Sequence, residues 1–419
     1  MKMTRDAQHT FDSKQHKKPT TRLLVALFFL VLNIAGAYDA HAQSTCGNTK
    51  LVCLIPTVLH TTSSTFNFFN TAFATQIAQL PQPSRASGFL FTLDKSLGVY
   101  TVSQQSFGPV LSERAETIGR NKLYLAFNYQ RYGFGYLDGN SLKNLSILFY
   151  FPTVQTPQVV TNPSTRVDAK FNQYVASGTY GITDKLDASI SVPFGLVTMG
   201  VGSQGTEYST TTNAMASFSE YLAGSAAGVG DVVFSGKYGL WKLEKFSLAV
   251  GGEFRIPTGS ARNFLGSGAY GLEPYVVMSR RARVTPHLDL GYQWNSKSVL
   301  ATNSSGQQQN LPGFFAYDAG VDIGATRKVT VVADLLGQVF FNAPQITTPR
   351  TVTTLVNNQP KSFNTVVQTS GSYNVDNFAI GVKGNPWRNL LITANVSIKL
   401  NEAGLRATAV PLAGVSYSF

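Results

Sequence analysis

The sequence predicts an all-β fold, a transmembrane antiparallel β-barrel of about 12 strands with an irregular N-terminal segment. Three observations predict it. Stretches of about ten residues alternate between apolar and polar side chains, short and long connections alternate between these stretches, and the chain ends on an aromatic strand. After the N-terminus no apolar run reaches the roughly 18 residues of a membrane helix. A membrane-bound chain must therefore cross as strands, which lipid tolerates only in a closed barrel.

Residues 1–42 are predicted to be a signal peptide. A basic stretch, Lys14–Arg22, precedes an apolar run, Leu23–Ala37, and the small-x-small pattern Ala40-His41-Ala42 follows. A transmembrane anchor is the alternative, but the apolar run is shorter than the roughly 20 residues that such a helix needs. We expect cleavage after Ala42.

Residues 43–120 lack regular alternation and carry Pro81, Pro83 and Pro109. We interpret them as a periplasmic or lumen-plugging segment, and a partly disordered leader is the alternative. Cys46 and Cys53 are the only cysteines. In an exported protein such a pair predicts a structural disulfide, because a metal site would need more ligands nearby.

Residues 121–419 are predicted to form the barrel. In its first strand, Leu123, Leu125 and Phe127 share one face while Ala126 and Asn128 share the other. An even number of strands returns both chain ends to the periplasmic side. The predicted strands are Lys122–Tyr132, Asp168–Tyr180, Leu186–Phe194, Asp231–Leu240, Phe246–Ile256, Leu272–Ser279, Val284–Asn295, Phe314–Ala325, Val329–Phe341, Asn374–Gly384, Asn389–Lys399 and Ala409–Phe419.

The connections between these strands alternate in length, as short periplasmic turns and long outer loops do in outer-membrane barrels. The short ones are Gly181–Lys185, Trp241–Lys245, Arg280–Arg283, Thr326–Lys328 and Asn385–Arg388. The expected outer loops, rich in Ser, Thr, Asn, Gln, Gly and Pro, are Gly133–Val167, Gly195–Gly230, Pro257–Gly271, Ser296–Gly313, Asn342–Tyr373 and Asn401–Thr408.

The last strand argues against a soluble β-sandwich, the structural competitor. Ala413, Val415, Tyr417 and Phe419 share one face, and the chain ends on that aromatic residue. This ending resembles the signal that the barrel-assembly machinery reads. We therefore expect Tyr417 and Phe419 to be the assembly signal and the bacterial outer membrane to be the location.

Charged residues of the strands fall on the parity that we assign to the lumen. Facing lipid at mid-depth, each Arg or Lys would cost about 2–4 kcal/mol. The alternative to a ligand-contacting lumen is an ion-pair network that fills a narrow barrel. The principal lumen-lining candidates are Asp231, Lys237, Glu253, Arg255, Asp289, Asp318, Asp322 and Asp334, and the same parity is assigned to Asp168, Lys170, Asp187, Glu273, Lys383 and Lys399.

Enzymatic, cofactor-binding and nucleic-acid-binding functions receive little support. The string Gly266–Gly271 matches G-x-G-x-x-G, but a strand rather than a helix is predicted to follow it. After cleavage only His60 and His287 remain, and we interpret His287 as a satisfied lumen histidine rather than a catalytic base. Residues 1–42 carry six basic and three acidic residues, so cleavage lowers the net charge from +12 to +9. That charge suits anionic lipid or lipopolysaccharide, but the cations are scattered along the sequence, so no nucleic-acid site is expected.

Several segments together resemble the meta-pathway phenol-degradation family. They are Ser106–Pro109, Glu113–Ala115, Ile118–Arg120, Asn128–Tyr132, Leu137–Gly139, Gly228–Val232, Gly236–Tyr238, Phe254–Gly259 and Leu265–Gly268. The resemblance spans about residues 60 to 419, departs at Phe234-Ser235, and leaves an unusually apolar Ile147–Phe151 in the first outer loop, which could line the lumen.

The resemblance implies an outer-membrane transporter-like barrel for apolar or aromatic compounds. The leading hypothesis is a channel for small hydrophobic solutes, because large apolar residues such as Tyr275, Leu336 and Leu412 also have inward parity. The first alternative is a structural or partner-binding barrel without transport, and the second is a barrel lipid hydrolase. The expected partners are outer-membrane lipid, lipopolysaccharide, the barrel-assembly machinery and a small apolar solute.

Overall fold

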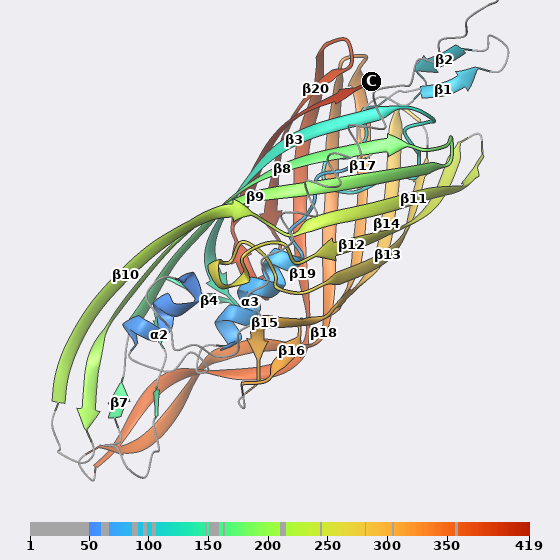
Figure 1. Cartoon of the computed structure of the whole chain (residues 1–419). Helices are drawn as coiled ribbons and strands as arrows, with labels where there is room; N and C mark the ends of the chain where they lie inside the picture. The colour runs from blue at the N-terminus through green and yellow to red at the C-terminus, as the bar shows by residue number, and fades with distance from the viewer. Residues whose placement is uncertain are drawn as a thin grey trace, which may run out of the picture. The chain divides into compact units, whose positions relative to one another are not determined.

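A computed structural model describes residues 50–59, 67–85, 91–94, 99–102, 106–146, 149–150, 159–161, 164–209, 215–243, 245–280, 282–303, 306–356 and 359–419. Within these residues the chain forms a closed antiparallel barrel of 12 spanning strands (Figure 1). The predicted fold class is confirmed. The expected signal peptide and Cys46 lie outside the described residues, so the cleavage site and the Cys46–Cys53 disulfide stay predictions.

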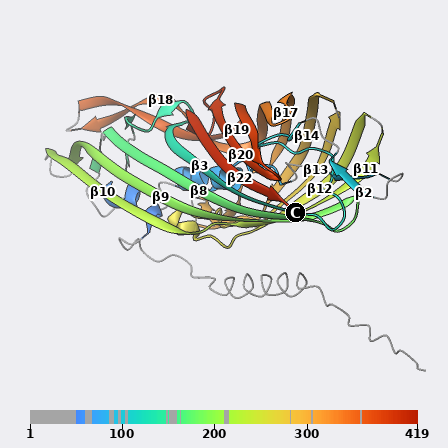
Figure 2. The ribbon, with the colours of Figure 1, turned by 90° about the horizontal axis from the view of Figure 1, so that it is seen from above.

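The spanning strands follow one another around the barrel in chain order. The last one, β22 (Ala409–Ser418), closes the barrel against the first, β3 (Leu123–Leu137), with Leu412 opposite Gln130 (Figure 2). Between them lie β8 (Ser164–Gly181), β9 (Leu186–Ser209), β11 (Val232–Lys242), β12 (Phe246–Ile256), β13 (Gly271–Arg280), β14 (Val284–Asn295), β17 (Phe314–Thr326), β18 (Val329–Val356), β19 (Gln359–Trp387) and β20 (Leu390–Lys399).

The alternation of each strand separates a polar interior from an apolar exterior. In β3, Asn128 and Gln130 are buried, while Leu125 and Phe127 on the other face are 44% and 49% exposed. The same holds in β22, where Leu412 is buried and Val415 is 47% exposed. A closed antiparallel barrel with an apolar outward face is the architecture in which strands cross the bacterial outer membrane, and this chain is an outer-membrane β-barrel.

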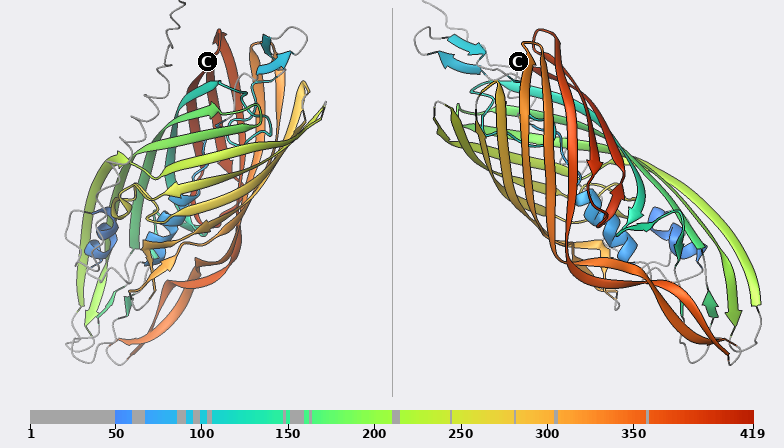
Figure 3. Two further views of the ribbon diagram at one scale, coloured as in Figure 1. Left: turned by 45° about the vertical axis from the view of Figure 1, so that its right-hand side comes forward. Right: turned by 180° about the vertical axis from the view of Figure 1, so that it is seen from behind.

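Two of the expected outer loops are wrong, because the strands continue through them (Figure 3). Residues 195–209 extend β9 and pair with β10 (Met215–Val229), and β18 pairs with β19 as far as Val356 and Gln359. The ladder needs only backbone groups, and beyond the lipid both faces of a hairpin can meet water. Ser-, Thr- and Gly-rich residues that resemble loops can therefore remain paired strands.

The other outer connections contain only short elements. The first holds β4 (Asn140–Ser141), β5 (Leu145–Ser146), β6 (Phe149–Tyr150) and β7 (Val159–Thr161). The later ones hold η3 (Ala261–Asn263), the separate hairpin of β15 (Lys297–Thr302) with β16 (Gln308–Asn310), and β21 (Leu405–Ala407). The side chains of Ile147–Phe151, expected as a possible apolar lining, lie outside the described residues.

The N-terminal segment contains short helices where the sequence analysis expected irregular chain. They are η1 (Leu51–Cys53), α2 (Leu54–Val58) and α3 (Asn67–Ala78), followed by the small hairpin of β1 (Phe91–Asp94) and β2 (Val99–Val102). Phe73 of α3 is 2% exposed, and its ring centroid lies 5.5 Å from that of Phe134 and 4.6 Å from that of Phe264. Burial by the barrel thus stabilises a short helix that its sequence alone would leave marginal. Among the described residues, no helix is long and apolar enough to cross a membrane.

Candidate functional site

The barrel interior holds two pieces of the N-terminal segment, residues 78–85 and 106–118. Their backbone groups bond to inward-facing strand residues. Gln130 Nε2 donates to Pro81 O (3.2 Å), Thr179 Oγ1 donates to Arg85 O (2.6 Å), and the amides of Phe107, Ala115 and Ile118 donate to Thr330 Oγ1 (2.9 Å), Ser279 Oγ (3.2 Å) and Asp187 Oδ2 (3.0 Å). Irregular backbone in a lumen needs such partners, which explains much of the polarity of the inward face.

Charged side chains join these pieces to β11 and β12. Glu113 Oε2 lies 3.3 Å from Lys237 Nζ, and Arg85 contacts both Glu113 and Glu253. Lys237 Nζ also donates to Arg114 O at 2.8 Å. Burial alone would raise the pKa of Glu113, but Lys237 and Arg85 outweigh burial and lower the pKa below its ordinary value. The Glu113 carboxyl group therefore stays charged at neutral pH.

A second polar cluster surrounds His287 of β14. Its Nε2 lies 2.8 Å from Ser112 Oγ and 2.9 Å from Asp334 Oδ1, and its Nδ1 lies 3.3 Å from Asp322 Oδ1. Ser112, His287 and Asp322 thus make the contacts of a catalytic triad. However, Ser112 is 1% exposed, and carboxylates contact both ring nitrogens, so no nitrogen is left to take the serine proton. The cluster fits the role of a lumen histidine that lies between two carboxylates and anchors residue 112.

Between the two N-terminal pieces lies a cavity of about 190 Å³. Residues 76–82 bound it on the side of α3, and Leu111 and Glu113 bound it on the other side. One wall carries apolar and aromatic side chains among polar ones such as Gln130, Gln173 and Asn395. Its apolar and aromatic residues are Tyr132, Phe134, Phe171, Leu336, Leu405, Val410 and Leu412. The facing wall is charged, formed by Asp231, Glu253, Arg255, Glu273, Asp289 and Asp318. A cavity that combines apolar side chains with a few polar groups can bind a small, mostly apolar molecule and orient its polar end.

The structure places all eight principal lumen candidates inside the barrel, where they contact different partners. Asp231 holds the connection on both sides of η3, because it accepts from Ser267 N (2.7 Å), Ser267 Oγ (2.6 Å) and Gly259 N (3.1 Å). Arg255 Nη1 donates to Ala78 O at 2.5 Å. Lys237 and Glu253 pair with the N-terminal segment, Asp322 and Asp334 contact His287, and Asp289 and Asp318 line the cavity.

Two of the further inward assignments are wrong. Asp168 and Lys170 lie on the outward face of β8, whose buried residues are the odd-numbered ones from Thr165 to Gly181. Both residues lie near the outer end of a strand that continues beyond the lipid, where an outward charge can meet water or headgroups rather than hydrocarbon. At this end of β8 an outward-facing charge therefore does not incur the free-energy cost of facing hydrocarbon.

Three features of the site were not predicted from the sequence: Arg85, Ser112 and the aromatic side chains of α3. Ser112 and Arg85 act through partners far away in the sequence, so no local spacing marks them. Phe73 contacts Phe69 within α3 and Phe134 and Phe264 outside it, and the last two contacts depend on how the helix lies against the barrel.

Part of the chain matches the model of a known protein family. The model of the family described as "Putative MetA-pathway of phenol degradation" matches residues 151–343, which confirms the resemblance predicted from the sequence. No curated protein matches the chain.

Solved structures of several outer-membrane proteins are similar in outline. An outer membrane channel from Pseudomonas putida F1 is 13% identical, with a TM-score of 0.47, over 73% of this chain and 98% of the channel. The NanC porin is 9% identical, with a TM-score of 0.39, over 70% of this chain and 98% of the porin. A Pseudomonas aeruginosa FadL homologue is 9% identical, with a TM-score of 0.29, over 71% and 88% of the two chains. The barrel assignment rests on the strand pairings rather than on these likenesses.

Proposed function

For an outer-membrane barrel whose residues 151–343 match the phenol-degradation family, we propose that the function is to pass small hydrophobic compounds, in particular aromatic ones. The observation that carries the proposal is the lumen cavity, in which a wall with several apolar and aromatic side chains faces a charged one. A monocyclic aromatic compound with one polar substituent matches both walls. The wall aromatics Tyr132 and Phe171, whose ring centroids lie 6.2 Å apart, provide a ring-binding surface.

The N-terminal segment bounds the cavity on two sides, so the solute passes when that segment shifts. Its contacts with the wall are mainly side chain to backbone hydrogen bonds and a few ion pairs, which can break one at a time. Leu111 and Leu336 pack together with Leu412 in a small apolar cluster beside the cavity. An apolar solute can pack against Leu336 and Leu412 in place of Leu111 and so replace a contact between the N-terminal segment and the wall.

Uptake of radiolabelled toluene by cells that express the protein tests the proposal. Leu412→Asn puts an amide on the apolar wall and should lower uptake roughly tenfold, in line with the free energy of burying one leucine. Ser416→Asn is the matched control, because Ser416 lies on the same strand and face but outside the cavity. Heat-modifiable migration in gels verifies that each variant folds.

Uptake equal to that of empty-vector cells for a panel of apolar solutes, together with no conductance in planar bilayers, would overturn the proposal. That outcome would favour a structural or partner-binding barrel, whose binding surface would be the extended hairpins beyond the lipid.

A lipid hydrolase has one observation in its favour, the contacts among Ser112, His287 and Asp322. Access argues against it, because Ser112 is almost fully buried and does not line the cavity. Nor does the cluster face the lipid, since all three side chains point into the lumen. Transport therefore remains the function that the geometry supports best.

A further inference from the structure

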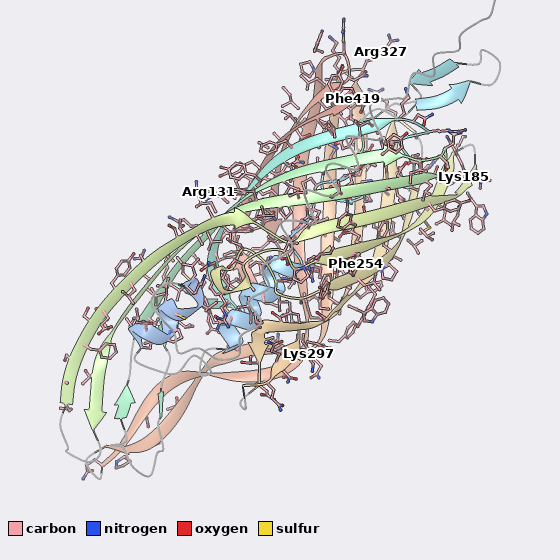
Figure 4. The ribbon with its side chains drawn as sticks, in the orientation of Figure 1. Arg131, Lys185, Phe254, Lys297, Arg327 and Phe419 are labelled. Carbon is pink, nitrogen blue, oxygen red and sulfur yellow. The ribbon has the colours of Figure 1, made fainter. Side chains whose placement is uncertain are left out.

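Exposed cations gather at the end of the barrel that carries the short turns. They come from different turns and strand ends around the whole circumference: Arg120, Lys185, Lys242, Lys245, Arg280, Arg283, Arg327, Lys328 and Arg388. Figure 4 shows Lys185, Arg327 and Phe419 at this end of the molecule. We call these nine residues the cationic rim. In outer-membrane barrels the short turns face the periplasm.

Carboxylates are fewer than cations at the rim. In the sequence of the five short turns the acidic residues are Asp184 and Glu244, and the structure describes the first of these. The opposite end is mixed in sign: there Arg166 Nε lies 2.8 Å from Asp168 Oδ2, and Lys399 Nζ lies 2.5 Å from Glu402 Oε2. The rim therefore carries more cations than carboxylates and has a net positive charge.

Large apolar side chains share the rim with the cations. Trp241 and Leu243 are 67% and 65% exposed, and Trp387 is 59% exposed. Arg388 Cζ lies 5.0 Å from the centroid of the Trp387 ring, and Arg280 Cζ lies 5.9 Å from that of Phe246. Aromatic rings with adjacent long cations are typical of the boundary between hydrocarbon and headgroups, where the ring lies in the apolar layer and the cation reaches the phosphates.

We propose that the cationic rim binds the phosphate groups of anionic phospholipid, of the phosphatidylglycerol kind, in the inner leaflet of the outer membrane. Charge complementarity selects an anionic headgroup, and the exposed Trp241, Leu243 and Trp387 place the cations at headgroup height. A soluble acidic protein would meet the cations but would leave these apolar side chains without a partner. The proposal does not depend on which solute the barrel passes.

Tryptophan fluorescence in vesicles can test the rim directly. Of the three tryptophans, Trp241 and Trp387 lie at the rim and Trp294 lies toward the other end of β14, so a Trp294→Phe background confines the signal to the rim. The protein is reconstituted into phosphatidylcholine vesicles that contain a fraction of brominated phosphatidylglycerol or brominated phosphatidylcholine. Stronger quenching by the brominated anionic lipid measures its preference for the rim.

At low salt we expect the rim to prefer phosphatidylglycerol over phosphatidylcholine roughly fivefold, because each cation at the interface is attracted to an anionic lipid surface. The preference should fall toward onefold in 0.5 M NaCl, because salt screens exposed charges. The rim variant Lys185→Gln, Lys245→Gln, Arg327→Gln, Lys328→Gln should lose most of the preference at low salt. It leaves Arg388 in place, so the cation beside the Trp387 ring is unchanged.

The matched control removes the same number and kinds of cations from the other end: Arg131→Gln, Lys143→Gln, Lys170→Gln, Lys297→Gln. It should keep the preference. Equal quenching by the two lipids in the unmodified protein would overturn the proposal and favour a soluble acidic partner. Equal loss in both variants would overturn it as well, because net charge rather than the rim would then set the preference. The salt titration needs no substitution, so the test holds even if a variant fails to fold.

Discussion

Glu113 and Lys237 are 124 residues apart in the chain, and their side chains meet 3.3 Å apart inside the barrel. The contact joins the N-terminal segment to β11 where both partners are largely shielded from water. Removing one partner leaves a buried charge uncompensated, which usually costs more than the pair contributes. The strength with which the segment is attached to the barrel wall can therefore be measured as a change in the free energy of unfolding when one partner is replaced.

Glu113→Gln should lower the free energy of unfolding by about 3 kcal/mol, because it leaves Lys237 buried without its partner carboxylate. Lys237→Met removes the charge as well and should restore part of the loss. Urea titration of the single and double variants gives the coupling, which we expect to be about 2 kcal/mol. Additive effects of the two substitutions would mean that the pair does not hold the segment.

Replacing Glu253 and Arg255 with Ala should raise the single-channel conductance while the barrel stays folded. Glu253 contacts Arg85, and Arg255 donates to Ala78 O, so both hold residues 78–85 against β12. Planar-bilayer recordings measure the change. Conductance and ion selectivity that both match the unmodified protein would show that these two residues do not control the lumen.

Cysteines placed in the β18–β19 hairpin, within residues 342–373, should react with a membrane-impermeant reagent on intact cells. Cysteines placed at residues 326–328 should react only after the outer membrane is opened. The expectation follows from the long hairpins at one end of the barrel and the short turns at the other. The reverse labelling pattern would invert the orientation and place the cationic rim outside the cell.

Deleting Phe419 should sharply reduce the heat-modifiable, membrane-inserted protein. Phe419 N donates to Leu123 O at 2.8 Å, and its ring centroid lies 4.6 Å from that of Tyr417, so the residue contributes both to barrel closure and to the outward aromatic pair. Phe419→Ala keeps the backbone bond and separates the two contributions. Normal assembly of both variants would count against an assembly signal.

Ser112→Ala should leave phospholipid hydrolysis by the purified protein at background. His287 contacts carboxylates at both ring nitrogens, so Ser112 lacks an available base. The measurement is release of fatty acid from phosphatidylcholine vesicles by the unmodified protein and the variant. Hydrolysis that disappears with Ser112→Ala would support the lipid-hydrolase alternative.

The sequence by itself determined which residues face lipid and which face the lumen in the spanning strands. Successive side chains of a strand point to opposite faces. Where one face meets lipid and the other meets the lumen, apolar and polar residues therefore alternate in the sequence. Leu125 and Phe127 are exposed and Asn128 is buried, as their parity predicts. Beyond the lipid both faces meet water, so apolar and polar residues no longer alternate. For this reason β10 and the outer parts of β18 and β19 resemble loops in the sequence, and the parity of Lys170 predicts the wrong face.

Only the tertiary structure decided what meets in the lumen and at the rim. Ser112 reaches His287, and Arg85 reaches Glu253, because closure of the barrel brings segments that are distant in the chain within hydrogen-bond range. Cations that are scattered along the sequence, such as Lys185 and Arg327, gather at one end because every second connection of an antiparallel barrel returns to the same side. Local pattern fixes the direction of a side chain, whereas its partners depend on closure.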